Sequence, residues 1–456
     1  MGIFCKAINI SRRGKQGSSL LYWLYQAVGS AVLFLSYPLI LLLVRLRPGD
    51  GLGLGQRLAR TLPACRKKND GTPRVWIHAA SVGEVAAAGV LIRELTAGGR
   101  QLDLVLTTMT AQGLTVARQQ LPRAICSFLA PLDLAWIVRR VLAHVRPDIY
   151  ICLETELWPA MLRELRKAGT CMVLLNGRMT AKSFRRYRLA RGLMGPLLQG
   201  FAGVAVIREE DGTRIAGLGV APKRIQVTGN IKFDFPPEDI PATSLHYRKR
   251  LDVDREAVFL CGSTRDGEEL LLTEAYKTLA AQAGGELVWV IAPRHLRRLD
   301  EVHGILTGLG LGFDLYSELA HRRRRQKIVL VDCLGELARL YSAGDYNFVG
   351  GSLVARGGHN IMEAARWGRP VYYGPHIDDF RDAAHILEEA GGGFRVADAG
   401  QLAKQIIQHM TDTAAYRQAC AGAAAAIASQ KGAAGLQATM IIRQLTGSRG
   451  QAQDIY

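Results

Sequence analysis

The fold is decided by the stretch Val75-Trp-Ile-His-Ala-Ala-Ser-Val-Gly-Glu84. Its first half continues an apolar run that predicts a short buried strand over residues 74–79. Ser81 is a candidate helix N-cap, and Glu84 lies in the first turn of a helix that runs to Gly98. A strand that turns through small residues into a helix leaves backbone N–H groups to meet an anion. It also places the Glu84 carboxylate at the carboxyl edge of a sheet.

The same pattern of strand, turn and helix continues along the chain. Further apolar strands of the first half are expected at 103–108, 125–129, 148–153, 171–175 and 203–207. Those of the second half are expected at 257–261, 287–292, 327–331, 346–349, 370–373 and 393–396. Apolar strands that alternate with helices form parallel sheets covered on both faces. The sequence therefore predicts two doubly wound α/β domains.

The breaks in this pattern predict five parts. Residues 235–256 interrupt the alternation with prolines and a mixed-charge helix, which is typical of a linker. We expect a basic-flanked membrane anchor and stem at 1–70, a first domain at 71–234, the linker at 235–256, a second domain at 257–430, and a C-terminal helix and tail at 431–456.

In the N-terminal part, basic residues flank a long uncharged run. The formal net charge of the chain is +18, and half of it, +9, lies in the first 70 residues. No charged residue occurs from Gln16 to Val44, and a membrane span needs only about 20 apolar residues. We interpret this run as a retained anchor that contacts an anionic membrane surface. A hairpin bent at Gly29 and Pro38 that does not cross, or a buried helix of the soluble core, are the alternatives.

The eight cysteines are scattered and form no C-x-x-C pair. Several lie within apolar runs, as in Tyr150-Ile-Cys-Leu153. This usage is typical of reduced thiols that fill a core, and not of a disulfide or zinc framework. We therefore expect the soluble part of the chain in the cytoplasm.

Three lesser signals favour structural explanations. The basic run His321-Arg-Arg-Arg-Arg325 has no nucleic-acid motif beside it, so we expect no nucleic-acid partner and read the run as a basic loop that could face anionic lipid. Asp252-Val-Asp254 lies in the linker next to arginines and indicates a solvated charge cluster, not a metal site. Gly51-x-Gly-x-Gly55 follows no strand, which argues against a dinucleotide loop.

Polar residues collect where the predicted strands end, in positions that a core does not require. In the first domain these are Ser81, Glu84, Thr107, Thr108, Glu154, Glu156, Asn176 and Arg178. In the second they are Ser263-Thr264, Pro293-Arg294-His295, Gly335-Glu336 and the run Gly350 to Glu363. Within that run, Gly357-Gly358 would let the backbone approach a phosphate, Asn360 lies near a helix start, and Glu363 could bind ribose hydroxyls. Helix caps and solvated loops are the structural alternatives.

Over residues 76–400 the chain resembles the membrane-associated Kdo transferases, which add 3-deoxy-D-manno-octulosonic acid (Kdo) to lipid A precursors. The matching motifs, in chain order, are His78-Ala-Ala-Ser-Val-Gly-Glu84, Thr107-Thr-Met-Thr110, Pro131-Leu-Asp133, Glu154-Thr-Glu-Leu-Trp-Pro159, Asn176-Gly-Arg178, Thr228-Gly-Asn-Ile-Lys-Phe-Asp234, Pro293-Arg-His295, Gly350-Gly-Ser-Leu-Val354, Arg356-Gly-Gly-His-Asn360 and Gly374-Pro-His376. The resemblance implies two facing Rossmann-like domains, the GT-B arrangement of glycosyltransferases.

The resemblance also implies the reaction. The donor would be CMP-Kdo, the acceptor a glucosamine hydroxyl of a lipid A precursor, and the anomeric carbon would invert with no metal or other cofactor. Glu84 would be the general base, and Glu154 and Lys232 would stabilise the transition state. The residues that would hold CMP are Pro293, Arg294, Leu334, Gly335, Glu336, Asn360, Ile361, Met362 and Glu363. A GT-B enzyme for another nucleotide sugar, or a membrane protein that binds nucleotide or nucleic acid without catalysis, are the alternatives.

The chain departs from the family pattern at three places in the second domain. The usual Ser-Thr-His is Ser263-Thr264-Arg265, the usual Met-Gly-Glu is Leu334-Gly335-Glu336, and the usual Asn-Pro-Leu-Glu is Asn360-Ile-Met-Glu363. The second of these changes replaces only the methionine and keeps the glutamate, Glu336. The third loses a proline that would preset the first helical turn.

Overall fold

The computed structural model describes residues 20–40, 53–65, 71–235 and 237–453. The chain divides into two compact units. The first comprises the residues up to Asp234 together with those from Gly432 onward, and the second comprises Phe235–Lys431. Each unit is built around one sheet.

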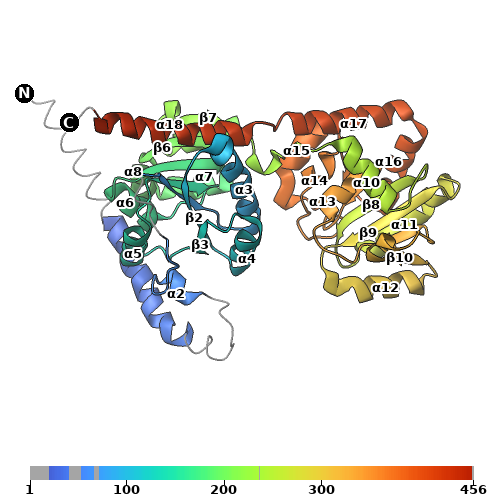
Figure 1. Cartoon of the computed structure of the whole chain (residues 1–456), viewed down its shortest axis with the longest axis horizontal. Coiled ribbons are helices and arrows are strands. Elements are labelled where there is room, and N and C mark those ends of the chain that lie inside the picture. The colour runs from blue at the N-terminus through green and yellow to red at the C-terminus, as the bar shows by residue number, and fades with distance from the viewer. Residues whose placement is uncertain (1–19, 41–52, 66–70, 236, 454–456) are drawn as a thin grey trace, which may run out of the picture. The chain divides into compact units, whose positions relative to one another are not determined.

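The sheet of the first unit has seven parallel strands in the order β3-β2-β1-β4-β5-β6-β7 (Figure 1). Their bounds are β1 Arg74–His78, β2 Asp103–Thr108, β3 Cys126–Leu129, β4 Ile149–Leu153, β5 Cys171–Gly177, β6 Phe201–Val206 and β7 Ile225–Val227.

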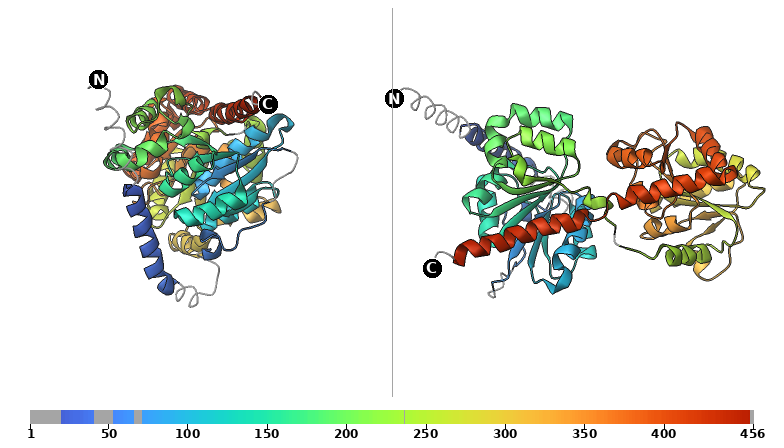
Figure 2. Two further views of the ribbon diagram at one scale, coloured as in Figure 1. Left: turned by 90° about the vertical axis from the view of Figure 1, so that its left-hand side faces the viewer. Right: turned by 90° about the horizontal axis from the view of Figure 1, so that it is seen from above.

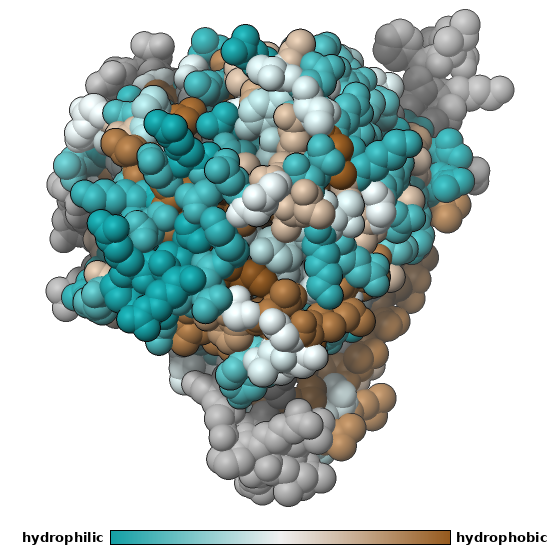
Figure 3. Space-filling model, turned by 90° about the vertical axis from the view of Figure 1, so that its right-hand side faces the viewer, coloured by the Kyte–Doolittle hydropathy of each residue, from teal (hydrophilic) through white to brown (hydrophobic). Residues whose placement is uncertain are grey.

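The sheet of the second unit has seven parallel strands in the order β10-β11-β9-β8-β12-β13-β14. Their bounds are β8 Ala257–Thr264, β9 Leu287–Pro293, β10 Phe313–Leu315, β11 Ile328–Leu330, β12 Tyr346–Val349, β13 Val371–Tyr373 and β14 Gly393–Arg395. The face of the second unit drawn in Figure 3 is mostly hydrophilic, as expected of a chain with many exposed arginines.

Helices connect the strands in both units. Those of the first unit are Leu20–Ile40, α2 Leu54–Arg57, α3 Val82–Thr96, α4 Ala111–Gln120, α5 Ala135–Val145, α6 Pro159–Lys167, α7 Ala181–Leu189, α8 Arg191–Leu198, α9 Glu209–Gly217 and α18 Ala433–Gln453. Those of the second unit are α10 Ile240–Arg250, α11 Glu268–Gln282, α12 Leu299–Gly308, α13 Leu337–Leu340, α14 Met362–Ala365, α15 Arg381–Glu389, α16 Ala399–Thr411 and α17 Thr413–Ala428.

The strand side chains divide between two cores, one on each face of the first sheet. Trp76 and Tyr150 belong to one apolar cluster, while Val75 and Ile77 belong to the other. All four are buried because successive strand residues point to opposite faces and helices cover both. The predicted doubly wound α/β fold is confirmed for each unit.

The two strands that the sequence analysis missed are short and lie at sheet edges. β7 and β10 have three residues each, and Gln226 and Val227 of β7 are exposed. A strand of this length has too few buried residues to show a period, so only pairing with β6 or β11 identifies it.

The segment expected as a linker contains a helix that belongs to the second unit. The Tyr247 hydroxyl of α10 donates to the Glu336 carboxylate over 2.7 Å, and the Ser244 hydroxyl donates to the Ser342 carbonyl over 2.8 Å. The division between the units is at Asp234 and Phe235. Most of the segment 235–256 is therefore not a free linker, because side chains of α10 form hydrogen bonds with residues of the second unit.

The C-terminal helical region is broken where the chain returns to the first unit. Gly432 has φ +86°, and the Asp234 carboxylate accepts from the N–H groups of Gly432 and Ala434. After this cap, α18 packs on the first unit, with Ala438 and Ile441 buried in its core (Figures 1 and 2). The last helix thus completes the first domain instead of forming a separate tail.

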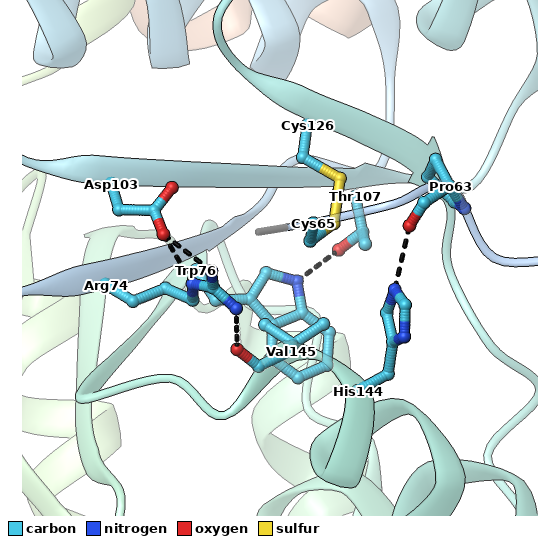
Figure 4. Close-up of a disulfide and its surroundings, with 9 residues drawn as sticks. All are labelled: Pro63, Cys65, Arg74, Trp76, Asp103, Thr107, Cys126, His144 and Val145. Atoms are coloured by element: carbon cyan, nitrogen blue, oxygen red, sulfur yellow. Dashed lines mark hydrogen bonds and ion pairs between the residues drawn. A yellow bond between two sulfur atoms is a disulfide. The ribbon is translucent and has the colours of Figure 1, made fainter. Parts of the chain in front are cut away.

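A disulfide between Cys65 and Cys126 corrects the expectation that the chain contains only reduced thiols (Figure 4). The stem after α2 returns to the edge strand β3, which brings the two Cα atoms to 5.8 Å across a sequence separation of 61 residues. Nothing in the cysteine spacing indicates this return. Cys152, Cys171, Cys261, Cys333 and Cys420 are free, and Cys5 lies outside the described residues.

The basic run at 321–325 is tied into the second unit. Arg322 forms ion pairs with Asp314 and Glu318, and Arg324 pairs with Glu256 over 2.7 Å. The Arg324 guanidinium also donates to the carbonyls of residues 251 and 252. These contacts give two of its arginines a structural role.

The disulfide generates a stability prediction. Replacing Cys65 with Ser should lower the free energy of unfolding by about 2–4 kcal/mol, because the crosslink restricts a long loop in the unfolded chain. Chemical denaturation of both proteins would measure the loss. Cys333→Ser, which removes a free thiol, is the matched control.

Alkylation in denaturant gives a direct count. Two fewer cysteines should be modified before reduction than after it. Equal modification in both cases would contradict the disulfide.

Candidate functional site

The turn between β1 and α3 holds Glu84 by both of its carboxylate oxygens. Oε2 accepts from the Ala80 N–H and Oε1 from the Ser81 hydroxyl, each over 2.8 Å. The Ser81 hydroxyl oxygen in turn accepts from the Glu84 N–H over 3.3 Å, so Ser81 is the helix N-cap. This reciprocal arrangement is a form of capping box, and it fixes the position of the carboxylate.

Glu84 is 5% exposed, and its surroundings change its acidity. Burial, and second the nearby charge of Glu154, raise the pKa of Glu84 to about 7. The hydrogen bonds from residues 80 and 81 and the charge of Lys232 act in the opposite direction. A carboxyl group with this pKa is divided between its acid and base forms near neutral pH, which suits proton transfer.

Glu154 and Lys232 form an ion pair beside this turn. Glu154 follows β4 in a left-handed conformation with φ +57°, which a non-glycine residue adopts only where its surroundings enforce it. The Lys232 ammonium also lies next to the start of α3, since a Cβ atom at Gly83 would be 3.7 Å from it. The first unit therefore brings Glu84, Glu154 and Lys232 together, as their motif positions led us to expect.

Two asparagines hold the 3₁₀ helix Ile231–Phe233 that carries Lys232. The Asn176 side-chain oxygen accepts from the Ile231 N–H, and that of Asn230 accepts from the Lys232 N–H, each over 3.0 Å. Asn176 is buried, and it is the residue before the last of β5, with φ +53°. Both asparagines stand within motifs quoted above, but their positioning role depends on contacts that the sequence does not show.

In the second unit, a buried glutamate that the sequence analysis missed organises the loop after β12. The Glu268 carboxylate accepts from the N–H groups of Arg265, Gly351, Ser352 and Leu353, with distances from 2.6 to 3.0 Å. Burial raises the pKa of Glu268 in spite of these four donors. Its signal in the sequence is an acid in the first turn of an apolar helix, a pattern that many ordinary helix starts share.

Asn360, Glu363 and Arg294 form the polar part of the predicted nucleotide site. The Asn360 amide donates to the Glu363 carboxylate over 3.1 Å, and the Asn360 side-chain oxygen accepts from the Met362 N–H over 3.2 Å. Burial raises the pKa of Glu363, and the nearby charge of Arg294 acts against it. The Arg294 side chain is exposed, whereas its N–H donates to the Thr264 carbonyl.

The other predicted nucleotide residues are placed less directly. The side chains of Pro293, Ile361 and Met362 are buried, so only their main chain is available to a ligand. Leu334 is 73% exposed, and Gly335 next to it has φ +91°. The Glu336 carboxylate accepts a hydrogen bond from the Tyr247 hydroxyl of α10. Glu336 therefore has a structural partner within the second unit.

Gly357 and Gly358 pack closely against neighbouring side chains. A Cβ atom at Gly357 would come within 2.6 Å of the Asp379 carboxylate, and one at Gly358 within 2.3 Å of the Ile377 side chain. Their φ values are +79° and +78°. Both glycines are required by the close packing of this loop on residues 376–379, and α14 after Asn360 is a helix of only four residues.

Among the described residues, no group of three or more His, Cys, Asp or Glu side chains is arranged to hold a metal ion. The Asp252-Val-Asp254 segment ends α10 and turns into β8, with Asp252 at φ +51°. The carbonyls of Leu251 and Asp252 accept hydrogen bonds from the Arg324 guanidinium of the basic run.

The chain is similar in sequence to proteins of known family. The family model of 3-deoxy-D-manno-octulosonic-acid transferases (kdotransferases) matches residues 53–235. The 3-deoxy-D-manno-octulosonic acid transferase of Bordetella pertussis is 33% identical over 77% of this chain and 82% of its own. A bifunctional glycosyltransferase/methyltransferase of Fusobacterium nucleatum is 30% identical over 73% of this chain, which spans only 52% of that protein's length.

A solved structure shares the fold. The UDP-GlcNAc 2-epimerase from Neisseria meningitidis bound to UDP-GlcNAc aligns with a TM-score of 0.56 over 81% of this chain and 100% of its own, at 13% identity. This likeness shows a common α/β architecture and carries no further information about the ligand.

The raised pKa of Glu84 predicts a pH-dependent contribution to stability. A carboxyl group that binds its proton more tightly in the folded chain favours folding at low pH, and this contribution is lost as pH rises from about 4.5 to about 7. Glu84→Gln does not titrate. The melting temperature of the unsubstituted chain, relative to that of Glu84→Gln, should therefore fall as pH rises from about 5 to about 8.

Thermal melts across this pH range would measure the difference. Glu94→Gln, which removes an exposed carboxylate from the same helix, is the control. A difference between the unsubstituted chain and Glu84→Gln that is constant with pH would show that the Glu84 pKa is not raised.

Proposed function

The chain belongs to the family of 3-deoxy-D-manno-octulosonic acid transferases, which are glycosyltransferases, and we propose that it transfers Kdo from CMP-Kdo to a glucosamine hydroxyl of a lipid A precursor. The proposed product belongs to lipopolysaccharide synthesis. The observation that carries the proposal is the buried Glu84 beside the Glu154–Lys232 ion pair, at the carboxyl edge of the first sheet.

Glu84 acts as the general base in this proposal. The acceptor oxygen attacks the anomeric carbon on the face opposite the phosphate, and the Glu84 carboxylate takes the hydroxyl proton. The new C–O bond forms as the bond to the phosphate breaks, CMP leaves with that electron pair, and the anomeric carbon inverts. The turn around Ser81 keeps the carboxylate in place throughout, because its two hydrogen bonds are made before any substrate binds.

Glu154 and Lys232 stabilise charge around the reacting atoms. Their ion pair holds the ammonium close to α3, where the positive charge favours the ionised form of Glu84. A fixed ammonium needs little reorganisation when negative charge develops on a phosphate or a sugar oxygen. Asn176 and Asn230 position this lysine through the short helix on which it stands.

The donor nucleotide binds at the carboxyl ends of the strands of the second sheet. Arg294 follows β9 and provides the positive charge, while Asn360 and Glu363 provide hydrogen-bonding groups after β12. Pro293, Ile361 and Met362 contribute through the main chain, and Leu334, Gly335 and Glu336 form a second wall after β11. Ligands of open parallel sheets bind at this edge.

The N-terminal helix Leu20–Ile40 attaches the first unit to a membrane in this proposal. It is the helix that, among the described residues, is long and apolar enough to cross a bilayer. One face is docked on the first unit. The Tyr25 hydroxyl donates to the Asp133 carboxylate over 2.8 Å, and the Gln26 side-chain oxygen accepts from the Ala135 N–H over 2.7 Å.

The opposite face of this helix is apolar and exposed, and it includes Trp23, Phe34 and Leu35, of which the last two are about 80% exposed. Next to the helix, Gly192 of α8 lies close to Leu21, and α7, which directly precedes α8, exposes several arginines and the 91% exposed Leu189. A helix with one docked face and one apolar face, flanked by basic residues, suits the interface of an anionic membrane. We therefore propose that it lies in the membrane without crossing. Because the Cys65–Cys126 disulfide removes the support that reduced thiols gave to a cytoplasmic location, the proposal that both units are on the cytoplasmic side of the inner membrane rests on the family alone.

Removing the base should abolish transfer. Glu84→Gln keeps the size of the side chain but cannot accept a proton, so the rate of Kdo transfer should fall by about 10²- to 10⁴-fold. Mass spectrometry of a lipid A precursor incubated with freshly made CMP-Kdo would measure it. Glu94→Gln on the exposed face of the same helix should retain the rate, and a Glu84→Gln variant as active as that control would contradict the role.

The donor specificity separates this function from its alternative. CMP should raise the melting temperature of the unsubstituted chain and of Glu84→Gln, whereas UMP, UDP and GDP should raise it less. A larger shift with UDP would favour a glycosyltransferase for another nucleotide sugar.

The membrane attachment can be tested with the native Cys5, which precedes the helix. If the helix does not cross, a membrane-impermeant maleimide added outside spheroplasts should leave Cys5 unmodified until the membrane is opened. The protein should also stay on membranes washed with high salt and leave them in detergent. Labelling of Cys5 from outside would show that the helix crosses, and release by salt alone would show that its apolar face is not inserted.

A further inference from the structure

Arg265 occupies a different environment from Arg298, which lines the same cavity. A cavity of about 360 Å³ in the second unit is lined by Arg265, Asp266, His295, Arg297, Arg298, Glu301 and Arg356. Arg298 in its wall is fully matched by carboxylates, since it pairs with Glu269 over 2.7 Å and with Glu301 over 2.8 Å. Within the described part of the chain, the Arg265 guanidinium forms no ion pair with a carboxylate.

Two histidines hold Arg265 instead. Its Nη1 lies 2.8 Å from Nε2 of His295, and its Nε lies 3.2 Å from Nε2 of His359. A guanidinium can only donate, so both histidines accept at Nε2 and are neutral. The surroundings agree, because burial and the charges of Arg294 and Arg265 lower the pKa of His359 to about 4. The histidines therefore fix the guanidinium without reducing its charge.

The backbone is shaped around this arrangement. Gly351 has φ +71°, and a Cβ atom there would come within 3.1 Å of the His359 ring and 3.5 Å of the Arg265 side chain. The Arg265 N–H and the Gly351 N–H both donate to the Glu268 carboxylate, which fixes the start of α11 against the loop after β12. Arg265 thus stands on a built platform at the carboxyl ends of the central strands.

Positive charge exceeds negative charge in this cavity, because its lining has four arginines but only two carboxylates, Asp266 and Glu301. Burial, and next the charges of Arg294 and Arg356, lower the pKa of Arg265, and Asp266 and Glu268 compensate less. Like charges that are held together and desolvated favour the binding of an anion. The remaining N–H groups of the Arg265 fork are suited to two oxygens of a phosphate or a carboxylate.

We propose that Arg265, held by His295 and His359, is a specificity-determining residue that binds an oxyanion of the sugar-nucleotide donor. The inference rests on the proposed function, because CMP-Kdo carries two such groups, the phosphate and the carboxylate of the sugar acid. A guanidinium stays protonated throughout the physiological pH range, so Arg265 provides a permanent positive charge at this site.

The test compares binding of CMP, which has only the phosphate, with binding of CMP-Kdo, which has both groups. Arg265→Gln should raise the dissociation constant of CMP-Kdo by about 10- to 100-fold, because a hydrogen-bonded charge pair is lost. An equal loss for CMP would assign the phosphate, and an unchanged affinity for CMP would assign the carboxylate. Free Kdo as a competitor would be weakened only in the second case.

Three further proteins complete the design. Arg265→Lys keeps the charge but cannot bond both histidines while binding two oxygens, so its loss should lie between those of the native chain and Arg265→Gln. If Arg265→Gln does not fold, Arg265→Lys and Arg265→His replace it. Arg323→Gln removes an exposed charge from the same unit and is the control for net charge.

The outcomes separate this inference from the proposed function. If the native chain binds and transfers Kdo, and Arg265→Gln and Arg265→Lys bind CMP and CMP-Kdo within about twofold of it, the inference is wrong and the function stands. If the native chain does not use CMP-Kdo, the function fails. A loss in Arg323→Gln as large as that in Arg265→Gln would also overturn the inference, since it would reflect net charge alone.

Discussion

Parallel pairing of the strands is the constraint on which the rest of the structure depends. It places the carboxyl ends of all strands of a sheet at one edge. Glu84 follows β1, Glu154 follows β4, and Asn176 stands at the end of β5, so residues far apart in the chain meet there. The strands themselves are buried on both faces, which leaves this edge as the place where polar side chains can gather without disturbing the core.

The two units use this edge with opposite charge. In the first, a buried carboxyl group lies beside a second carboxylate and one ammonium, which together bring its pKa close to neutral pH. In the second, arginines meet neutral histidines, and Arg265 is held without a carboxylate partner. The first arrangement favours proton transfer and the second favours anion binding. Both require groups that are held in place before a substrate arrives, and buried hydrogen bonds supply that rigidity.

The N-terminal region is more closely joined to the first unit than an anchor needs to be. Its helix bonds to Asp133 and Ala135, the stem after it is linked to β3 through Cys65 and Cys126, and the Arg163 guanidinium lies 3.8 Å from the centre of the Tyr22 ring. Asp133 also accepts from the N–H groups of Ala160 and Met161 at the start of α6. One half-buried carboxylate thus ties the helix to α6, so the exposed apolar face of the helix and Glu84 belong to one compact unit.

The sequence by itself determined the α/β class and most strands, and it singled out Glu84, Glu154 and Lys232 as candidate site residues, because apolar runs bounded by turn residues and short motifs are local properties. Only the tertiary structure decided which of these residues meet. The Cys65–Cys126 disulfide, the return of α18 to the first unit and the role of Asn176 depend on contacts between distant segments. The same holds for Gly357 and Gly358, whose conformational freedom was expected from their residue type, but whose space is occupied by Asp379 and Ile377. Local pattern sets which groups stand at a strand end, and long-range packing sets what surrounds them.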